Sequence, residues 1–155
     1  MINISRFSLG STAAIITSMG LIAGLTQGAS TKKETIVGLL IIAIVDNVSD
    51  SLGIHIYKES EGVPRREIKI STYGNYLARL VVALTFVLIV LLFSPPAVII
   101  ISSAWGLVLL SILSYSIAKN KKSNLWREIF WHLSVAILVI VGSKLLGNLI
   151  TRMIA

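Results

Sequence analysis

The sequence predicts an all-α membrane protein with five transmembrane helices, and three observations lead to this fold class. Hydrophobic residues make up 55% of the 155 residues, charged residues make up only 14%, and the mean hydropathy is +0.86. One globule of this size cannot bury so apolar a composition, whereas a surface that faces lipid accommodates it. Apolar runs of about 20 residues, the length that crosses a bilayer, recur along the chain. Short clusters of basic and turn-forming residues separate them.

The first two spans are expected at residues 7–27 and 35–57. The first is rich in Gly, Ser, Thr and Ala, as transmembrane helices often are. A cleaved signal peptide starting at Arg6 is the competing interpretation, but the apolar run is long for one. The uninterrupted apolar part of the second segment is too short to cross a bilayer alone. It therefore either continues past Asp46 and Asp50 to span, or re-enters the side it came from.

Turn signals place the remaining spans. These are expected at residues 76–94, 97–118 and 129–150. Pro95 and Pro96 cannot continue a helix, so they predict a tight hairpin whose two helices pack antiparallel. The hydrophilic segment from Lys58 to Tyr73 is expected to be an interfacial loop. Its acidic residues alternate with Lys and Arg, which is typical of a solvated surface.

Composition and charge exclude several other classes of protein. We expect residues 1–155 to form a single transmembrane domain with no soluble domain. The chain has no cysteine, which excludes disulfides and thiolate chemistry. Its net charge of +7 comes from residues between the apolar runs, so membrane topology explains it better than nucleic-acid binding. The Lys and Arg bias predicts a cytoplasmic amino terminus and an external carboxyl terminus, with few basic residues outside. Those outside are Lys32, Lys33, Lys144 and Arg152.

Asp46 and Asp50 are the strongest candidates for chemistry, because they are the acidic residues within the predicted spans. Their separation of four positions places them on one face of a helix. Carboxylates at bilayer depth are costly and mark ion paths or proton relays. Because two nearby carboxylates resist being ionised together, a divalent cation could displace a proton there. Asn47 and Ser49 could add oxygen ligands, and the alternative is that the acids form a structural ion pair, for example with Lys144.

Several residues of the other spans have competing structural and functional interpretations. Gly20, Gly24 and Gly28 repeat every four residues, which permits close helix packing within the chain or between two copies. Met19 is a possible soft metal ligand, although a methionine in an apolar helix usually packs in the core. Arg79, just inside the third span, is expected to anchor that helix at the headgroups.

Several short motifs resemble the vacuolar iron transporter family. They are Gly24-Leu25-Thr26-Gln27-Gly28-Ala29-Ser30, then Gly38-Leu39-Leu40-Ile41-Ile42-Ala43, and then Lys58-Glu59-Ser60-Glu61. In that family a glycine-rich first helix ends in a Gly-Ala-Ser type turn, and a second small-residue helix leads into a Lys/Ser/Glu motif. The proline-marked hairpin, the basic loop before the fifth span and Gly147 also resemble it.

The resemblance implies a five-helix homodimer that exports or sequesters Fe(II) or Mn(II) from the cytoplasm in exchange for protons. The chain also departs from the family pattern. The acidic residue of the first helix falls at Ala13, the Glu of the second helix falls near Ile41 or Ile42, and its Met falls near Ser49 or Asp50. The cytoplasmic metal-collecting helices are absent. Any transport chemistry is therefore left to Asp46 and Asp50.

We therefore expect a proton-coupled transporter of iron or manganese. It has no permanently bound cofactor, the metal is its transported substrate, and its partners are the bilayer, the metal ion, the proton and a second copy. The alternative is a noncatalytic membrane module that assembles with itself or a partner through its glycine-rich first helix. We expect no enzymatic activity, because no catalytic motif occurs.

Overall fold

The structure, a computed structural model, describes residues 5–95, 97–121 and 123–154. These residues form helices joined by short turns, and five of the helical segments are long and apolar enough to cross a membrane. The five segments are Ser8–Gln27, Lys32–Ser60, Arg65–Leu92, Ala97–Asn120 and Leu125–Ile154. The prediction of a five-span, all-α membrane protein is therefore confirmed.

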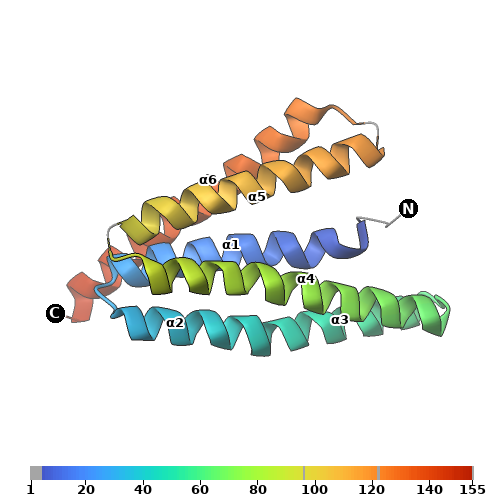
Figure 1. The fold of residues 1–155 in the computed structure, drawn as a ribbon, viewed down its shortest axis with the longest axis horizontal. Helices are drawn as coiled ribbons and strands as arrows, with labels where there is room; N and C mark the ends of the chain where they lie inside the picture. The colour runs from blue at the N-terminus through green and yellow to red at the C-terminus, as the bar shows by residue number, and fades with distance from the viewer. Residues whose placement is uncertain (1–4, 96, 122, 155) are drawn as a thin grey trace.

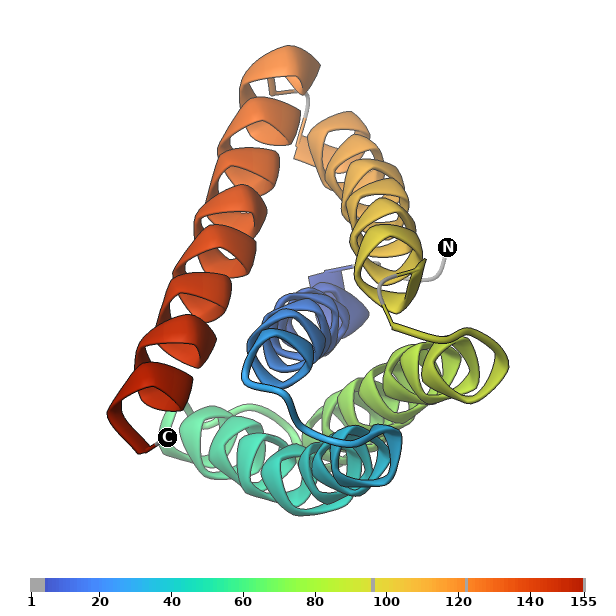
Figure 2. The same ribbon diagram turned by 90° about the vertical axis from the view of Figure 1, so that its left-hand side faces the viewer.

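Helix α1 (Ser5–Gln27) occupies the centre of the bundle. It packs against α4 (Arg65–Leu92), α5 (Ala97–Lys121) and α6 (Leu125–Ile154), as the end-on view in Figure 2 shows. The core combines buried α1 residues such as Ile15, Met19 and Ile22 with Phe86 and Val90 of α4. The small residues of α1 explain its position, because they let several neighbours approach closely.

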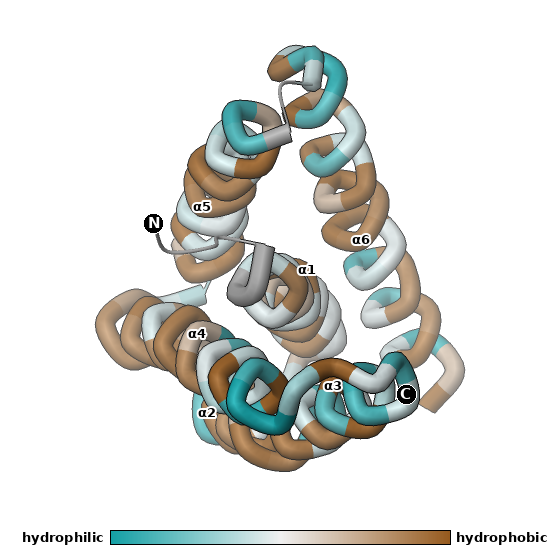
Figure 3. Tube along the Cα trace, turned by 90° about the vertical axis from the view of Figure 1, so that its right-hand side faces the viewer, coloured by the Kyte–Doolittle hydropathy of each residue, from teal (hydrophilic) through white to brown (hydrophobic). Residues whose placement is uncertain are grey.

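The outer surface is apolar along most of the length of the helices, as lipid contact requires. Leu138 and Leu145 on α6, for example, are 71% and 64% exposed. Figure 3 shows hydrophilic residues gathered near the turns at the helix ends. This distribution identifies a multi-pass integral membrane protein, since a water-soluble bundle would expose its polar residues instead.

The second segment is continuous and not re-entrant. It consists of α2 (Lys32–Ile41), a π-helical turn η1 (Ile42–Asp46) and α3 (Asn47–Ser60), which follow one another without a break (Figure 1). A capping box starts α2: the Thr31 hydroxyl accepts a hydrogen bond from the Glu34 amide at 3.2 Å, and the Glu34 carboxylate accepts one from the Thr31 amide at 2.7 Å. At about 1.5 Å per residue, the 29 residues extend about 43 Å, which is enough to span.

The connection between α3 and α4 is much shorter than expected. The interfacial loop predicted from Lys58 to Tyr73 is wrong, because α3 continues to Ser60 and α4 begins at Arg65. Gly62 supplies the positive φ (69°) of the turn, a backbone conformation that glycine adopts without strain. The polar residues after the turn therefore extend α4 by about three helical turns beyond the apolar run that begins at residue 76.

The hairpin between α4 and α5 is tight, but its helices separate. They run antiparallel from the Pro95 turn and are linked by a hydrogen bond of 3.0 Å from the Trp105 indole to the Thr85 hydroxyl. Away from the turn α5 diverges from α4, as Figure 1 shows, and α1 lies between them in Figure 2. The expected antiparallel packing therefore holds only near the turn.

Candidate functional site

Asp46, Asp50 and Arg79 form an ion triad between the second and third spans. The Arg79 guanidinium donates to Asp46 through Nη2 and to Asp50 through Nη1, and each aspartate accepts through Oδ2. Arg79 is only 1% exposed, so it does not anchor α4 at the headgroups as the sequence suggested. From the sequence alone, Lys144 was a possible ion-pair partner of the two acids. In the structure their partner is Arg79.

The local backbone explains why both acids reach the same arginine. Asp50 lies one α-helical turn after Asp46, so their side chains share a face. Asp46 is also the last residue of the π-helical turn, where the Asn47 amide reaches back five residues to the Ile42 carbonyl. A π-turn holds one extra residue, which rotates the following helix by about 100° relative to an uninterrupted α-helix. The turn therefore sets which side of α3 faces Arg79.

The triad has a closed side and an open side. The Arg79 side chain is 2% exposed, whereas those of Asp46 and Asp50 are 45% and 43% exposed. The Oδ1 atom of each carboxylate makes no hydrogen bond within the described part of the chain. Two ionised carboxylates and one guanidinium carry a net charge of −1. The triad therefore presents two free oxygens and an excess negative charge on its open side.

Buried and half-buried polar residues continue from the triad toward the α3–α4 turn. Asn47 donates a hydrogen bond of 2.9 Å to the Tyr76 carbonyl, and Lys58 donates one of 2.7 Å to the Ser71 hydroxyl. Asn75 lies between these contacts along α4 and is fully buried against Gly10 of α1. The polar side chains at these positions are Asn47, Ser51, Lys58, Ser71 and Asn75. They form a nearly continuous polar strip inside an apolar bundle.

Several atoms of this strip lack partners among the described residues. They are the Asn47 Oδ1, the Ser51 Oγ, both amide atoms of Asn75 and the Arg79 Nε. An unpaired polar group in a protein interior costs about 1–3 kcal/mol, and the penalty is severe within a bilayer. Polar groups retained at membrane depth despite this cost are characteristic of functional sites.

The other predicted site residues lie in different environments. Of the proposed oxygen ligands, Asn47 is buried beside the triad, whereas Ser49 lies on the exposed side of α3. Met19 is buried in the core, where its side chain packs directly over Gly106 of α5. The described residues contain no cluster of three or more His, Cys, Asp or Glu side chains placed to hold a metal. The two aspartates are therefore the acidic oxygen ligands that the triad provides.

The glycine face of α1 packs against α6 of the same chain. A Cβ atom on Gly24 would lie 3.3 Å from the Ser143 carbonyl oxygen, and one on Gly20 would lie 2.8 Å from a methyl group of Val139. Gly28 lies over Gly147, where a Cβ would come within 3.8 Å of the Gly147 Cα. A groove of about 530 Å³ runs beside these glycines. Their close helix packing therefore occurs within one chain.

Comparisons with family models, with curated proteins and with solved structures gave no match. The resemblance to vacuolar iron transporters therefore stays a prediction from the residue motifs.

Sequence reasoning found both acids but missed Arg79 as their partner. The signal available was Arg79 itself, a permanently charged residue three positions inside an apolar span that begins at residue 76. Such a residue is costly in lipid unless an acidic partner accompanies it. Hydropathy does not show which side of a helix a residue faces. The pairing of Arg79 with Asp50 and Asp46, which lie 29 and 33 positions earlier in the chain, could therefore not be derived from the pattern.

Proposed function

We propose that this chain is a proton-coupled transporter of a divalent transition metal, Fe(II) or Mn(II), with Asp46 and Asp50 as its cation-binding groups. One observation carries the proposal: two carboxylates in a membrane-spanning helix are nearly half exposed while the arginine that pairs with them is buried. Lipid disfavours such exposure, so the open side of the triad suits a water-accessible path for ions. Carboxylate oxygens are suitable ligands for Mn(II) and Fe(II).

Arg79 supplies a reason for proton coupling. In the ion-free state its guanidinium neutralises one of the two carboxylate charges, which makes the site tolerable inside the membrane. Protonation of either aspartate weakens its ion pair with Arg79. A divalent cation that binds through the Oδ1 atoms competes with both the proton and the guanidinium. Binding of metal and release of a proton are therefore linked through the same pair of side chains.

The direction of transport and the assembly belong to the same proposal. The basic-residue bias predicts a cytoplasmic amino terminus and an external carboxyl terminus. The resemblance to vacuolar iron transporters implies export or sequestration of metal from the cytoplasm and a homodimer. Because α6 of the same chain packs on the glycine face of α1, such a dimer would use other surfaces.

A noncatalytic membrane module is the second candidate. It is favoured by the pairing of Arg79 with both aspartates, because these two ion pairs also hold α4 against the second span. In that case the charges specify how the helices pack and take no part in transport.

Flux measurements on single substitutions separate the two candidates. The intact protein in proteoliposomes with an imposed pH gradient should take up Mn(II) or Fe(II). Asp46→Asn and Asp50→Asn should each reduce this uptake at least about tenfold, because even the loss of an outer-shell partner of a metal ligand costs about 10- to 100-fold in affinity or activity. Single variants are preferable because the remaining aspartate still pairs with Arg79.

Glu61→Gln is the matched control, since it removes one carboxylate from the exposed turn between α3 and α4. It should leave uptake unchanged. Uptake by both aspartate variants at the level of the intact protein would exclude these ligands. No uptake of either metal by the folded, inserted protein would favour the module.

A further inference from the structure

Two adjoining cavities lie on one side of the hairpin formed by α3 and α4. The first is a polar pocket of about 220 Å³ near the turn, lined by His55, Glu59, Arg65, Ile68 and Lys69. The second is an apolar groove of about 530 Å³, whose lining includes Leu52, Tyr73 and Leu77. His55 lines both cavities. The polar pocket and the apolar groove therefore meet at this residue.

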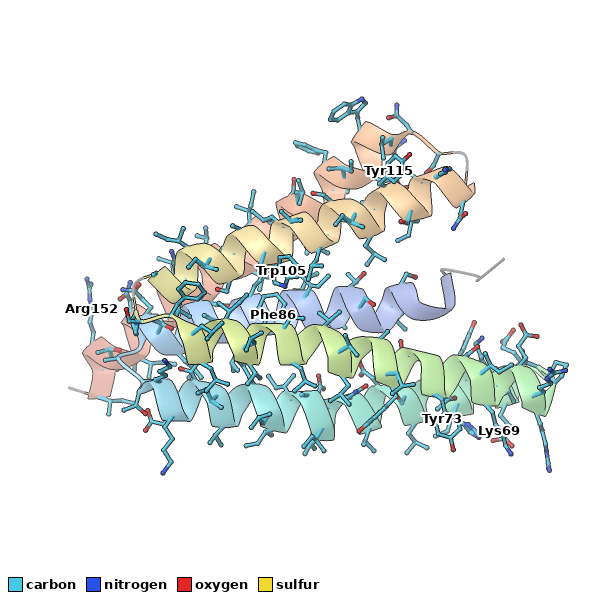
Figure 4. The ribbon with its side chains drawn as sticks, viewed as in Figure 1. Lys69, Tyr73, Phe86, Trp105, Tyr115 and Arg152 are labelled. Carbon is cyan, nitrogen blue, oxygen red and sulfur yellow. The ribbon has the colours of Figure 1, made fainter. Side chains whose placement is uncertain are left out.

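Helical spacing shows that the two cavities form one continuous surface. On α4, Arg65, Lys69, Tyr73 and Leu77 follow one another at intervals of four residues, which places them in one row along the helix. On α3, Leu52, His55 and Glu59 form the facing row. Figure 4 shows Lys69 and Tyr73 projecting from the same side of α4 near the turn. The surface thus changes from charged to apolar along its length.

The depth of this change matches a lipid layer. The 20 residues from Tyr73 to Leu92 extend about 30 Å, the thickness of the hydrocarbon core. Lys69 then lies about 6 Å beyond that core and Arg65 about 12 Å beyond it, within or just outside the headgroup layer. Tyr73 is at the boundary, where tyrosines are common. The apolar groove is therefore at the depth of acyl chains.

The charges of the polar pocket are available to a ligand. Arg65 and Lys69 are exposed, and neither side chain forms an ion pair or hydrogen bond with another described residue. Glu59 is the acidic residue that lines the pocket, so the formal charges of Arg65, Lys69 and Glu59 sum to +1. A phosphodiester carries a charge of −1, and its attached chains require an apolar surface directly below it.

We infer that this surface binds an anionic phospholipid, whose phosphate contacts Arg65 and Lys69 and one of whose acyl chains lies along Leu52, Tyr73 and Leu77. A free phosphate would satisfy the pocket alone and would leave the apolar groove unexplained. The continuity of the two cavities through His55 therefore selects a lipid. The inference does not depend on the proposed transport function.

Native mass spectrometry of the full chain in detergent tests this site, with phosphatidylglycerol and phosphatidylcholine of identical acyl chains as probes. The intact protein should retain phosphatidylglycerol in preference to phosphatidylcholine. The double variant Arg65→Gln, Lys69→Gln should weaken binding of phosphatidylglycerol by about tenfold or more, because each basic residue near an anionic headgroup contributes about fivefold. Soluble glycerol phosphate should not displace the lipid.

The matched control is the double variant Lys33→Gln, Arg66→Gln, which removes the same charge from exposed positions outside the pocket. It should bind phosphatidylglycerol like the intact protein. Equal retention of the two lipids, an equal loss in the control, or displacement by glycerol phosphate would each overturn the inference. Far-UV circular dichroism of every variant confirms that it is folded.

Discussion

Removing Arg79 should destabilise the protein through the charges that it leaves behind. In Arg79→Gln, Asp46 and Asp50 lose the cation that pairs with them inside a membrane-spanning bundle. Breaking a buried ion pair from one side costs about 3–5 kcal/mol, whereas an exposed pair contributes about 0–1 kcal/mol. Because the carboxylates are 45% and 43% exposed, we expect an intermediate loss of about 2–3 kcal/mol in the free energy of unfolding.

Removing the two acids instead of the arginine should cost more stability. In the double variant Asp46→Asn, Asp50→Asn the guanidinium, whose side chain is 2% exposed, stays buried without a counter-charge. The full penalty of about 3–5 kcal/mol then applies. The triple variant, which adds Arg79→Gln, leaves three neutral amides that are able to hydrogen-bond to one another. Its stability should return to within about 1 kcal/mol of the intact protein.

Equilibrium unfolding in mixed detergent micelles, followed by far-UV circular dichroism, measures these differences. The control is Arg66→Gln, which removes an exposed arginine from the first turn of α4 and should be neutral within about 0.5 kcal/mol. If the cost of the triple variant equals the sum of the other two costs, the three charges are not coupled and the reasoning fails. The triple variant should also show no metal uptake although it is folded, which separates stability from transport.

Two further substitutions test the packing and the start of α2. Gly147→Ala should cost about 1–3 kcal/mol in the free energy of unfolding, because its Cβ would collide with the Gly24 carbonyl oxygen. Gly142→Ala on the same helix meets no atom within 4 Å and should be neutral or slightly stabilising. Thermal melts of the two variants give the comparison, and equal melting temperatures would contradict the close contact. Thr31→Ala should lower the free energy of unfolding by about 1 kcal/mol through loss of the capping box with Glu34. It should also speed hydrogen exchange of the Glu34 amide. An unchanged exchange rate would show that the cap contributes nothing.

Hydropathy predicted the five membrane-spanning helices, and two of the predicted ends coincide with helix ends in the structure. Helix α1 ends at Gln27 and α5 begins at Ala97, as predicted, because glycine, proline and polar residues interrupt the apolar runs there. The segment from Lys58 to Tyr73 was placed wrongly for a physical reason. A helix continues into the headgroup layer and beyond, where polar residues are favourable, so the end of an apolar run is not the end of a helix.

The arrangement of the helices depended on contacts that the pattern does not encode. Three equally spaced glycines on α1 predict close packing, but the sequence does not name the neighbour, and the structure assigns it to α6. The role of Arg79 could not be derived either, since its partners lie on a different helix. The π-helical turn before Asn47 had no sequence signal, because the residues from Ile42 to Asp46 also suit a regular α-helix.

The central position of α1 has a consequence for biogenesis. Its glycine face packs on α6, and its Gln27 bonds at 3.0 Å to Asn148, a residue that the ribosome adds 121 positions later. Helix α1 therefore remains in the membrane without this neighbour until α6 has been inserted. The middle of the bundle closes only once α6 is in place. A nascent chain that stalls before α6 thus exposes the centre of the protein to lipid and to quality-control proteases, and not merely an edge.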